Sequence, residues 1–303
     1  MSIRFDGQVA VVTGAGRGLG RAHALALAAR GARVVVNDPG ADLRGEGAPV
    51  PVADAVVAEI AAAGGTAVAS RDDVGDATSA ALLVELALDT FGRLDVLVNN
   101  AGIMRDKVFK KMDLADFEKV VRVHLLGSAY VTRHAFPHMI RQDFGRVLMT
   151  TSAAGLYGAF GGANYAAAKL GIVGLTKSLS IEGARHNVLV NAIAPVAASR
   201  MSEALLAPAE FARMTPDHVV PAALMLCARD CCLTGQVLEV GAGYCAKVDI
   251  VEGHGLRYPA DRPPAPEMLA ARYAEVADMR DACSFTDALA LVRHVASSGG
   301  TGS

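Results

Sequence analysis

The sequence predicts an α/β fold: a single doubly wound parallel sheet of about seven strands with helices on both faces, followed by a C-terminal helical tail. Short β-branched apolar runs alternate with alanine- and leucine-rich segments of helical length, an order that implies crossover connections and a parallel sheet. A glycine-rich turn joins the first run to the first helical segment. The 303 residues, 52% of them hydrophobic, suffice for one large domain with a sizeable core.

The predicted strands are short runs that end at glycine or polar residues; they cover residues 8–13, 33–38, 66–74, 95–98, 145–150, 187–195 and 236–243. The predicted helices carry apolar residues at helical spacing; they cover residues 21–29, 54–63, 75–91, 114–141, 166–183 and 216–229. We expect Pro137 to kink or interrupt the helix over 114–141. Residues 39–51, rich in glycine and proline, predict a surface loop.

The domain organisation follows from a change of composition near residue 250. Residues 1–250 are expected to form one catalytic domain. Residues 251–303 are expected to form an extension that is not a separate domain: a proline-rich linker, one helix over 268–281 and a disordered end over 297–303. Residues 196–214 are small, polar and irregular, which indicates a mobile segment over the ligand crevice.

Composition narrows the class of protein. The formal net charge is −2, and no basic surplus points to a nucleic-acid partner. No apolar run of about 18 uncharged residues occurs, so we expect no membrane span. The start of the chain has no leader pattern, which favours a cytoplasmic location. The five cysteines are expected to be reduced thiols, and no metal site is predicted.

The glycine-rich turn has the form expected of a dinucleotide loop. Gly14, Gly18 and Gly20 follow the first strand directly, and Leu19 occupies the last glycine position of the commoner G-x-G-x-x-G spacing. Glycine allows a tight turn and a close approach of the backbone to a pyrophosphate at the helix N-terminus. Strand, glycine turn and helix together predict a nucleotide cofactor.

Two charged residues bear on which cofactor binds. Asp38 ends the second strand, where a carboxylate accepts both hydroxyls of an adenosine ribose and repels a 2′-phosphate. Arg17, beside the loop, favours the opposite choice, because a guanidinium pairs with that phosphate. We give Asp38 the greater weight and predict NAD over NADP.

The carboxyl ends of parallel strands meet at one edge of the sheet, where ligands bind. Side chains far apart in the sequence are therefore expected in one crevice. Beyond the glycine loop and Asp38, the predicted cofactor contacts are Asp73, Val74, Asn100, Ala101, Gly102, Pro195 and Ala198.

Tyr165 and Lys169 stand four residues apart on a predicted helix and so share one face. A phenol with a pKa near about 10 is a poor base at neutral pH, and a neighbouring ammonium group favours the phenolate. We therefore expect Lys169 to lower the pKa of Tyr165. Ser152, at the end of the fifth strand, would face the phenol and hold a carbonyl or carbinol oxygen. An isolated Tyr-x-x-x-Lys is usually structural, so the assignment depends on the accompanying motifs.

Together these residues resemble the short-chain dehydrogenase/reductase family. The resemblance covers residues 5–243 and rests on the glycine turn, Asn99-Asn100-Ala101-Gly102, Ser152, the Tyr165 and Lys169 pair and Pro195. It implies a Rossmann-type fold with Tyr165 as acid and base and Ser152 as the group that orients the substrate. It also implies that Lys169 lowers the phenol pKa and, like Tyr165, contacts the cofactor.

Two positions depart from the family pattern. His124 stands where the family usually has an asparagine of a proton relay, and Val196 stands where a glycine usually follows the proline. His124 is kept as a catalytic candidate, through its side chain or its backbone carbonyl. Tyr157 is a candidate substrate contact.

A closer resemblance is to the (3R)-hydroxyacyl-CoA dehydrogenase domain of peroxisomal multifunctional β-oxidation enzymes, also described as a 17β-hydroxysteroid dehydrogenase. Segments that carry it include Val35-Val36-Asn37-Asp38 and Arg122-Val123-His124-Leu125. This resemblance implies NAD-dependent oxidation of a (3R)-hydroxyacyl-CoA, or of a hydroxysteroid or sterol-degradation intermediate, by a homodimer or homotetramer. The alternatives are an NADPH-dependent 3-oxoacyl reductase and a non-catalytic cofactor sensor on the same fold.

Overall fold

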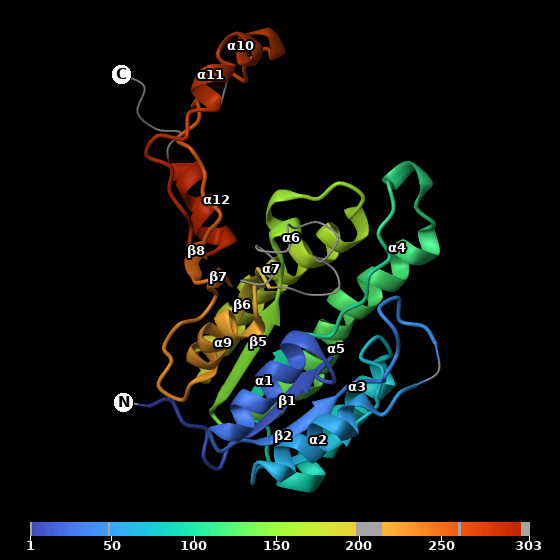
Figure 1. Ribbon diagram of the computed structural model, residues 1–303. Coiled ribbons are helices and arrows are strands. Elements are labelled where there is room, and N and C mark those ends of the chain that lie inside the picture. Colours follow the sequence, from blue (N-terminus) through green and yellow to red (C-terminus); the bar gives the residue numbers. More distant parts are fainter. Residues whose placement is uncertain (1, 48, 198–213, 260–261, 298–303) are drawn as a thin grey trace. The chain divides into compact units, whose positions relative to one another are not determined.

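The computed structural model describes residues 2–47, 49–197, 214–259 and 262–297 (Figure 1). The chain divides into two compact units, Met1–Lys247 and Val248–Ser303. Most of the segment expected over the crevice, including Ala198, and nearly all of the end expected to be disordered lie outside the described residues.

One sheet organises the first unit, with strand order β3-β2-β1-β4-β5-β6-β7-β8. Every pair from β3 to β7 is parallel, and the order reverses between β1 and β4, the point where ligands bind in such sheets. Seven strands match the prediction; β8, directly after the turn at 242–243, was not predicted. The strands are β1 Val9–Thr13, β2 Arg33–Asn37, β3 Thr66–Ser70, β4 Val96–Asn99, β5 Gly145–Thr150, β6 Val188–Pro195, β7 Val237–Gly241 and β8 Tyr244–Val248.

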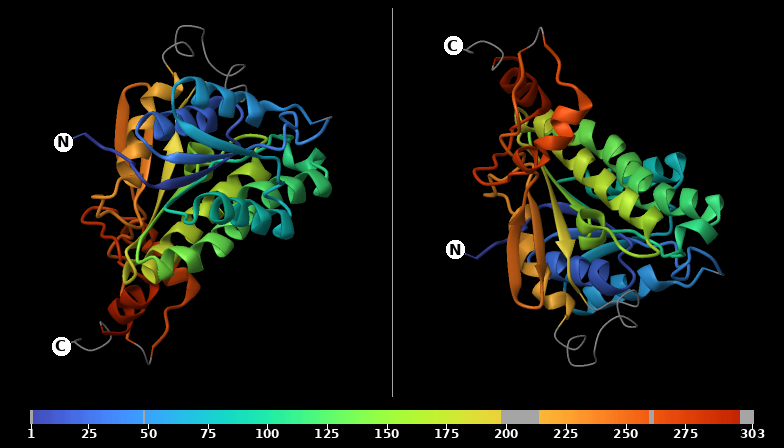
Figure 2. Two further views of the ribbon diagram at one scale, coloured as in Figure 1. Left: turned by 90° about the horizontal axis from the view of Figure 1, so that it is seen from below. Right: turned by 90° about the horizontal axis from the view of Figure 1, so that it is seen from above.

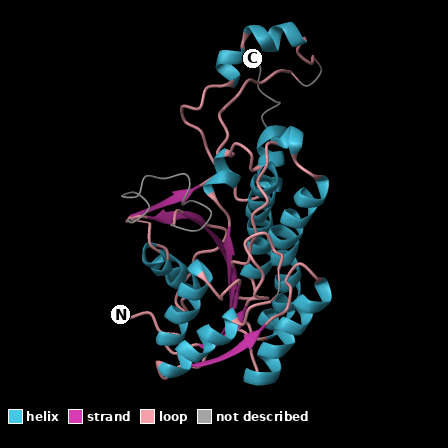
Figure 3. Ribbon diagram, turned by 45° about the vertical axis from the view of Figure 1, so that its right-hand side comes forward, coloured by secondary structure: helices cyan, strands magenta, loops and turns pink. Residues whose placement is uncertain are grey.

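Helices cover both faces of the sheet (Figures 2 and 3). On one face α1 packs against α2 and α9, and on the other α3, α5 and α7 pack together with α4. The helices among the described residues of this unit are α1 Gly18–Ala29, α2 Val52–Ala62, α3 Ala77–Phe91, η1 Phe109–Lys111, α4 Leu114–Val121, η2 Arg122–Leu126, α5 Gly127–Arg141, α6 Ala153–Tyr157, α7 Ala163–Ala184, η4 Pro216–His218 and α9 Val220–Cys227.

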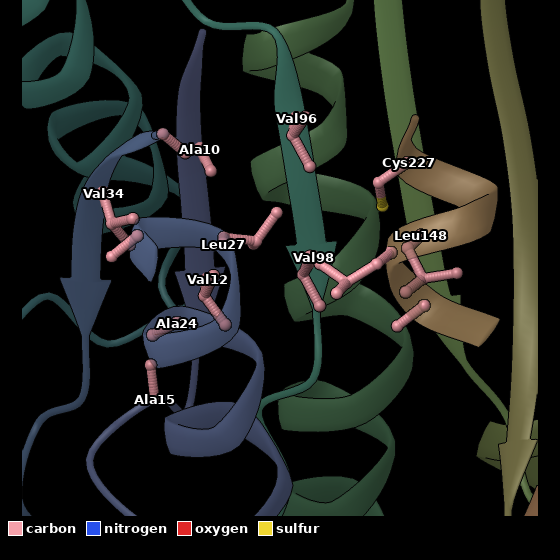
Figure 4. Packing of buried hydrophobic residues seen from close by; sticks show 14 of the residues in the cluster. Ala10, Val12, Ala15, Ala24, Leu27, Val34, Val96, Val98, Leu148 and Cys227 are labelled. Carbon is pink, nitrogen blue, oxygen red and sulfur yellow. The ribbon is translucent and has the colours of Figure 1, made fainter. Parts of the chain in front are cut away.

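The core follows the two-residue alternation of the strands. Figure 4 shows alternate side chains of β1 and β4, among them Val12 and Val98, pointing toward Leu27 of α1 and Cys227 of α9. Burial raises the pKa of the Cys227 thiol to about 12. All five cysteines are unpaired, and this one is inert because its thiolate is inaccessible at neutral pH.

The long helix expected over 114–141 is interrupted at a different place from the one predicted. Helix α5 continues through Pro137, so this residue does not interrupt the helix, and the kink expected there stays a prediction. Proline removes one hydrogen bond, and packing of α5 on α3 and the sheet holds the helix together. The irregularity lies upstream, in the π-helical turn η2, which contains His124. Such turns often occur at functional sites.

The second unit contains α10 Pro266–Ala271, α11 Tyr273–Val276 and α12 Ala288–Ser297. The single helix predicted over 268–281 was wrong, because Arg272 leaves helical geometry between α10 and α11. Helix α12 was not predicted. None of the described residues of this unit is buried.

His23 of α1 generates a prediction about pH. Its side chain is 1% exposed, and neither ring nitrogen has a partner among the described residues. Burial lowers its pKa from 6.5 to about 4. Because the folded-state pKa is the lower one, the buried neutral ring does not reduce the free energy of unfolding above pH 6.5. As pH falls from 6.5 through about 4, the unfolded chain binds a proton that the folded protein does not, and the free energy of unfolding decreases.

In the parent protein, the free energy of unfolding should fall by roughly 3 kcal/mol because of His23 as pH decreases over this range. We expect His23→Leu to lack this part of the decrease. Urea unfolding at a series of pH values measures the difference. Near neutral pH both proteins carry an uncharged side chain, so that comparison gives the effect of the replacement itself. Parallel pH profiles would contradict the prediction.

Candidate active site

The glycine turn takes the strained backbone that only glycine adopts easily. Gly14 and Gly18 have φ of 62° and 53°, and a Cβ on Gly20 would lie 2.2 Å from the Gly14 carbonyl oxygen. Helix α1 begins at Gly18, three residues before the predicted start. Leu19 and Gly20 therefore lie in its first turn, where backbone N–H groups have no intrahelical acceptor and are available to bind an anion.

Thr13 and Asn100 join the turn to β4. The Thr13 hydroxyl accepts from the backbone N–H groups of Asn100 and Ala101, both at 3.0 Å. The Asn100 side chain donates to the carbonyl oxygens of Thr13 (3.0 Å) and Gly14 (3.2 Å). Asn100 and Ala101 thus lie beside the glycine turn as predicted. Thr13 was not among the predicted contacts, although its position directly before Gly14 was a usable signal.

Asp38 lies against the same turn. One carboxylate oxygen accepts from the Gly16 N–H at 3.0 Å, and the other accepts from the Gly40 N–H at 2.8 Å. A Cβ on Gly16 would lie 2.8 Å from this carboxylate and 2.4 Å from the Val52 side chain, so a larger residue at this position would displace one of the two. Arg17 donates to the carbonyl oxygen of Ala41 at 3.3 Å. A tight glycine turn, a helix start and a fixed carboxylate fit the pyrophosphate and ribose of a dinucleotide.

The remaining predicted cofactor residues lie around the same edge. Asp73 accepts from the Gly75 N–H at 2.8 Å and has the Lys119 ammonium group 4.0 Å away. A Cβ on Gly127 would lie 2.9 Å from Val74, so these residues pack tightly. Pro195 is the last residue of β6.

Helix α7 presents Tyr165 and Lys169 on one face, as the spacing predicted. The Lys169 ammonium group lies 5.5 Å from the centre of the Tyr165 ring and donates to the Thr150 carbonyl oxygen at 2.6 Å. The Thr151 hydroxyl donates to the Lys169 carbonyl oxygen at 2.7 Å. These two contacts fix α7 to the end of β5.

Ser152 follows directly and caps α6, accepting from the Ala154 N–H at 3.2 Å. Helix α6 packs against α7. Burial raises the pKa of Tyr165, and the Ser152 hydroxyl opposes that rise. Tyr157, at the other end of α6, is 72% exposed; its contact with substrate stays a prediction.

The electrostatics differ from the expectation. Burial raises the pKa of Tyr165 despite the opposing effect of Ser152, and the negative charge of Asp106 raises it further. Burial also lowers the pKa of Lys169 to about 7. The predicted lowering of the phenol pKa by Lys169 is absent because desolvation outweighs a cation that is itself only partly charged near neutrality.

His124, in the π-helical turn, packs against Tyr165. The two rings meet edge to face, 5.1 Å between centres. The Nε2 atom lies 3.0 Å from the Ile103 nitrogen and 2.8 Å from the Ile103 oxygen, while Nδ1 is buried without a partner among the described residues. Burial lowers the pKa of His124 to about 3, so the ring is neutral. Its carbonyl oxygen accepts from the Ser128 hydroxyl at 2.7 Å.

The whole arrangement matches one known family. The family model described as short chain dehydrogenase matches residues 8–207. The chain therefore belongs to the short-chain dehydrogenase family and is an oxidoreductase, and members of this family bind a nicotinamide cofactor.

Several relatives are similar over most of the chain. Peroxisomal multifunctional enzyme type 2 of Mus musculus is 48% identical over 92% of this chain and 38% of its own length. A short-chain type dehydrogenase/reductase of Mycobacterium tuberculosis is 46% identical over 91% of this chain and 96% of its own length. The chain thus spans little more than a third of the mouse relative and nearly all of the mycobacterial one.

Solved structures agree with the fold. Full-length peroxisomal multifunctional enzyme type 2 of Drosophila melanogaster is 39% identical with a TM-score of 0.81, over 97% of this chain and 50% of that one. A 7α-hydroxysteroid dehydrogenase solved with NADH and 7-oxo glycochenodeoxycholic acid is 30% identical with a TM-score of 0.71, over 79% of this chain and 95% of that one.

Two predicted absences concern the described residues alone. Among them no helix has the length and apolar character to cross a bilayer. Within the same part of the chain no group of three or more histidine, cysteine or acidic side chains has the arrangement of a metal site. The homodimer or homotetramer and the cytoplasmic location stay predictions.

Gly102 generates a test of the His124 packing. A Cβ at this position would lie 2.3 Å from the imidazole ring, so Gly102→Ala must displace His124 and, through it, Tyr165. We expect dehydrogenase turnover to fall by roughly tenfold or more, with a stability loss of about 1–3 kcal/mol. Initial rates and thermal unfolding measure both effects.

Gly174→Ala is the matched control, because a Cβ on this residue of α7 meets nothing within 4 Å. This variant should keep full turnover and gain stability from a better helix former. Equal rates for the two variants would show that the position of His124 does not matter.

Proposed function

We propose that the protein is an NAD-dependent oxidoreductase that interconverts a secondary alcohol and a ketone. The observation that carries the proposal is the convergence of Ser152, Tyr165 and Lys169 at the sheet edge that also holds the glycine turn and Asp38. A non-catalytic cofactor sensor has no need of that set of side chains. We infer that the substrate is a (3R)-hydroxyacyl-CoA, or a hydroxysteroid or sterol-degradation intermediate.

The chain's own residues would act as follows. The hydroxyls of Ser152 and Tyr165 bind the substrate oxygen and fix the orientation of its carbon. Tyr165 takes the hydroxyl proton during oxidation and returns it during reduction. The bound nicotinamide supplies the hydride chemistry. Lys169, held by Thr150, donates hydrogen bonds beside the phenol, and neutral His124 limits the motion of the tyrosine ring.

The choice of NAD is supported by the fixed position of Asp38. Both of its oxygens accept hydrogen bonds from backbone N–H groups. The carboxylate therefore cannot rotate away from the 2′-phosphate that NADP would bring. Arg17 instead donates to a loop carbonyl oxygen. The fixed carboxylate of Asp38 repels a 2′-phosphate, whereas Arg17 must first break its hydrogen bond before it can attract one. The repulsion therefore outweighs the attraction.

The substrate class is supported by the relatives. A Neurospora crassa relative named peroxisomal hydratase-dehydrogenase-epimerase is 48% identical over 91% of this chain and 31% of its own length. The similarity to the 7α-hydroxysteroid dehydrogenase structure supports a hydroxysteroid as the substrate. The alternative, an NADPH-dependent 3-oxoacyl reductase, is favoured by a Synechocystis 3-oxoacyl-[acyl-carrier-protein] reductase that is 42% identical over 78% of this chain and 96% of its own length.

Tyr165→Phe tests the mechanism. Removal of the hydroxyl should reduce oxidation of a (3R)-hydroxyacyl-CoA or a hydroxysteroid by roughly 10³-fold, since no other group replaces the phenol. NADH formation measures turnover, and thermal stabilisation by NAD should persist in the variant. Tyr244→Phe, 58% exposed on β8, is the control. Undiminished turnover in Tyr165→Phe would end the proposed mechanism.

Cofactor preference is tested separately by thermal shift. NAD should raise the melting temperature of the parent protein more than NADP at equal concentration, since the shift grows with affinity. Asp38→Asn keeps an acceptor for one backbone N–H and removes the charge, so the preference should shift toward NADP by roughly tenfold. Asp42→Asn in the same loop is the control. A larger response of the parent protein to NADP would favour the reductase alternative.

A further inference from the structure

Residues 103–107, the connecting segment, contact several separate parts of the site. The backbone of Ile103 meets the His124 ring. Met104 donates from its backbone to the Leu43 carbonyl oxygen at 2.8 Å, and Lys107 donates from its backbone to the Gly161 carbonyl oxygen at 2.8 Å. The segment therefore joins the loop after β2 to the residues that precede α7.

Asn164 links this segment to Tyr165. Its side chain is 0% exposed. Its amide nitrogen donates to the Arg105 carbonyl oxygen at 3.1 Å, and its amide oxygen accepts from the Tyr165 N–H at 2.8 Å. That N–H lies in the first turn of α7 and has no acceptor within the helix. Gly162, the residue before the helix, offers no side-chain cap, so Asn164 supplies the acceptor.

The Arg105 side chain in turn fixes the connecting segment. Its guanidinium donates to the Asp116 carboxylate of α4 at 2.6 Å, the Glu46 carboxylate at 2.6 Å and the Arg44 carbonyl oxygen at 2.9 Å. The side chains of Arg105 and Asp116 are 13% and 15% exposed, so solvent screens this pair less than an ordinary surface ion pair. A planar guanidinium with three separate acceptors has little freedom to rotate.

We propose that Asn164 is a positioning residue for Tyr165 and that Arg105 holds it in place through the connecting segment. The loop over 42–46 and helix α4 thereby set the position of the phenol without touching substrate. The inference rests on the proposed role of Tyr165 as the group that moves the proton. It assigns to Arg105, Asp116 and Glu46 a function in turnover beyond the stability of the loop.

Steady-state kinetics of Asn164→Ala, Arg105→Met and the double variant form the first test. Each single variant should reduce kcat by roughly 10- to 100-fold, the effect of a misplacement of about 1 Å, and leave KM for alcohol and NAD within about twofold. Because both residues act through one contact, the double variant should lose little more than the worse single variant. Additive losses in log kcat would overturn the link.

Lys107→Met is the matched control on the same segment. Its ammonium group reaches Asp113 at 3.3 Å, and both side chains are well exposed, so kcat should stay at the parent value. If Arg105→Met unfolds, Asp116→Asn removes the ion pair while keeping size and shape, and it should reproduce the loss of kcat. Parent-like kcat in a folded Asp116→Asn and in Asn164→Ala would sink the proposal.

A second readout does not depend on substrate. The chain has six tyrosines and no tryptophan, so near-ultraviolet absorbance follows tyrosine ionisation alone. The difference between each protein and its Tyr165→Phe counterpart isolates one phenol. Burial raises the pKa of Tyr165, and loosening by Asn164→Ala or Arg105→Met should move it down toward about 10, whereas Lys107→Met should not.

The two readouts separate two kinds of failure. If the parent protein oxidises no alcohol but the phenol titration shifts in the variants, the positioning stands and the proposed function fails. If turnover is present and neither kcat nor the titration responds to Asn164→Ala, the positioning fails and the proposed function stands.

Discussion

The hydrogen bond from the buried Lys169 ammonium group to the Thr150 carbonyl oxygen is the contact on which the active-site arrangement depends. It joins the long helix α7 to the last residue of β5. The Thr151 hydroxyl makes a second contact of this kind by donating to the Lys169 carbonyl oxygen. Ser152 is then placed by the strand, and Tyr165 is placed one helical turn before Lys169. The end of one strand and one turn of a helix thus fix the three proposed catalytic groups relative to each other.

This geometry has an energetic cost. The Lys169 side chain is 3% exposed, and its burial penalises the charged form. The Nδ1 atom of His124 and the hydroxyl of Thr150 are buried without hydrogen-bond partners among the described residues, and each such group costs about 1–3 kcal/mol. The apolar layer between α1, α9 and the sheet offsets that cost. The core and the site are therefore coupled, because the core stabilises a fold in which polar groups of the site are held in unfavourable surroundings.

The parts of the site that the sequence predicted depend on local spacing. Tyr165 and Lys169 share a face because of helical periodicity, and the glycines of the turn mark backbone that other residues do not adopt. The π-helical turn at His124 was not predictable, because apolar residues continue on both sides of it and suggest one regular helix. Pro137 drew attention to the wrong place, since a missing N–H shows in the sequence whereas the packing that compensates for it does not. The pKa of Tyr165 was misjudged because its direction depends on depth of burial, which spacing does not reveal.

The contacts around Arg105 show why the rest of the site required the structure. Its acceptors are the Arg44 carbonyl oxygen and Glu46, in a loop far before it in the sequence, and Asp116, in a helix after it. No periodic pattern connects such partners, because only the folded chain brings them together. Asn164 carries their effect to the first turn of α7. Substitutions in the loop over 42–46 can therefore alter the position of Tyr165 while every residue of the recognisable motif stays unchanged, so an intact motif alone does not determine the activity of the site.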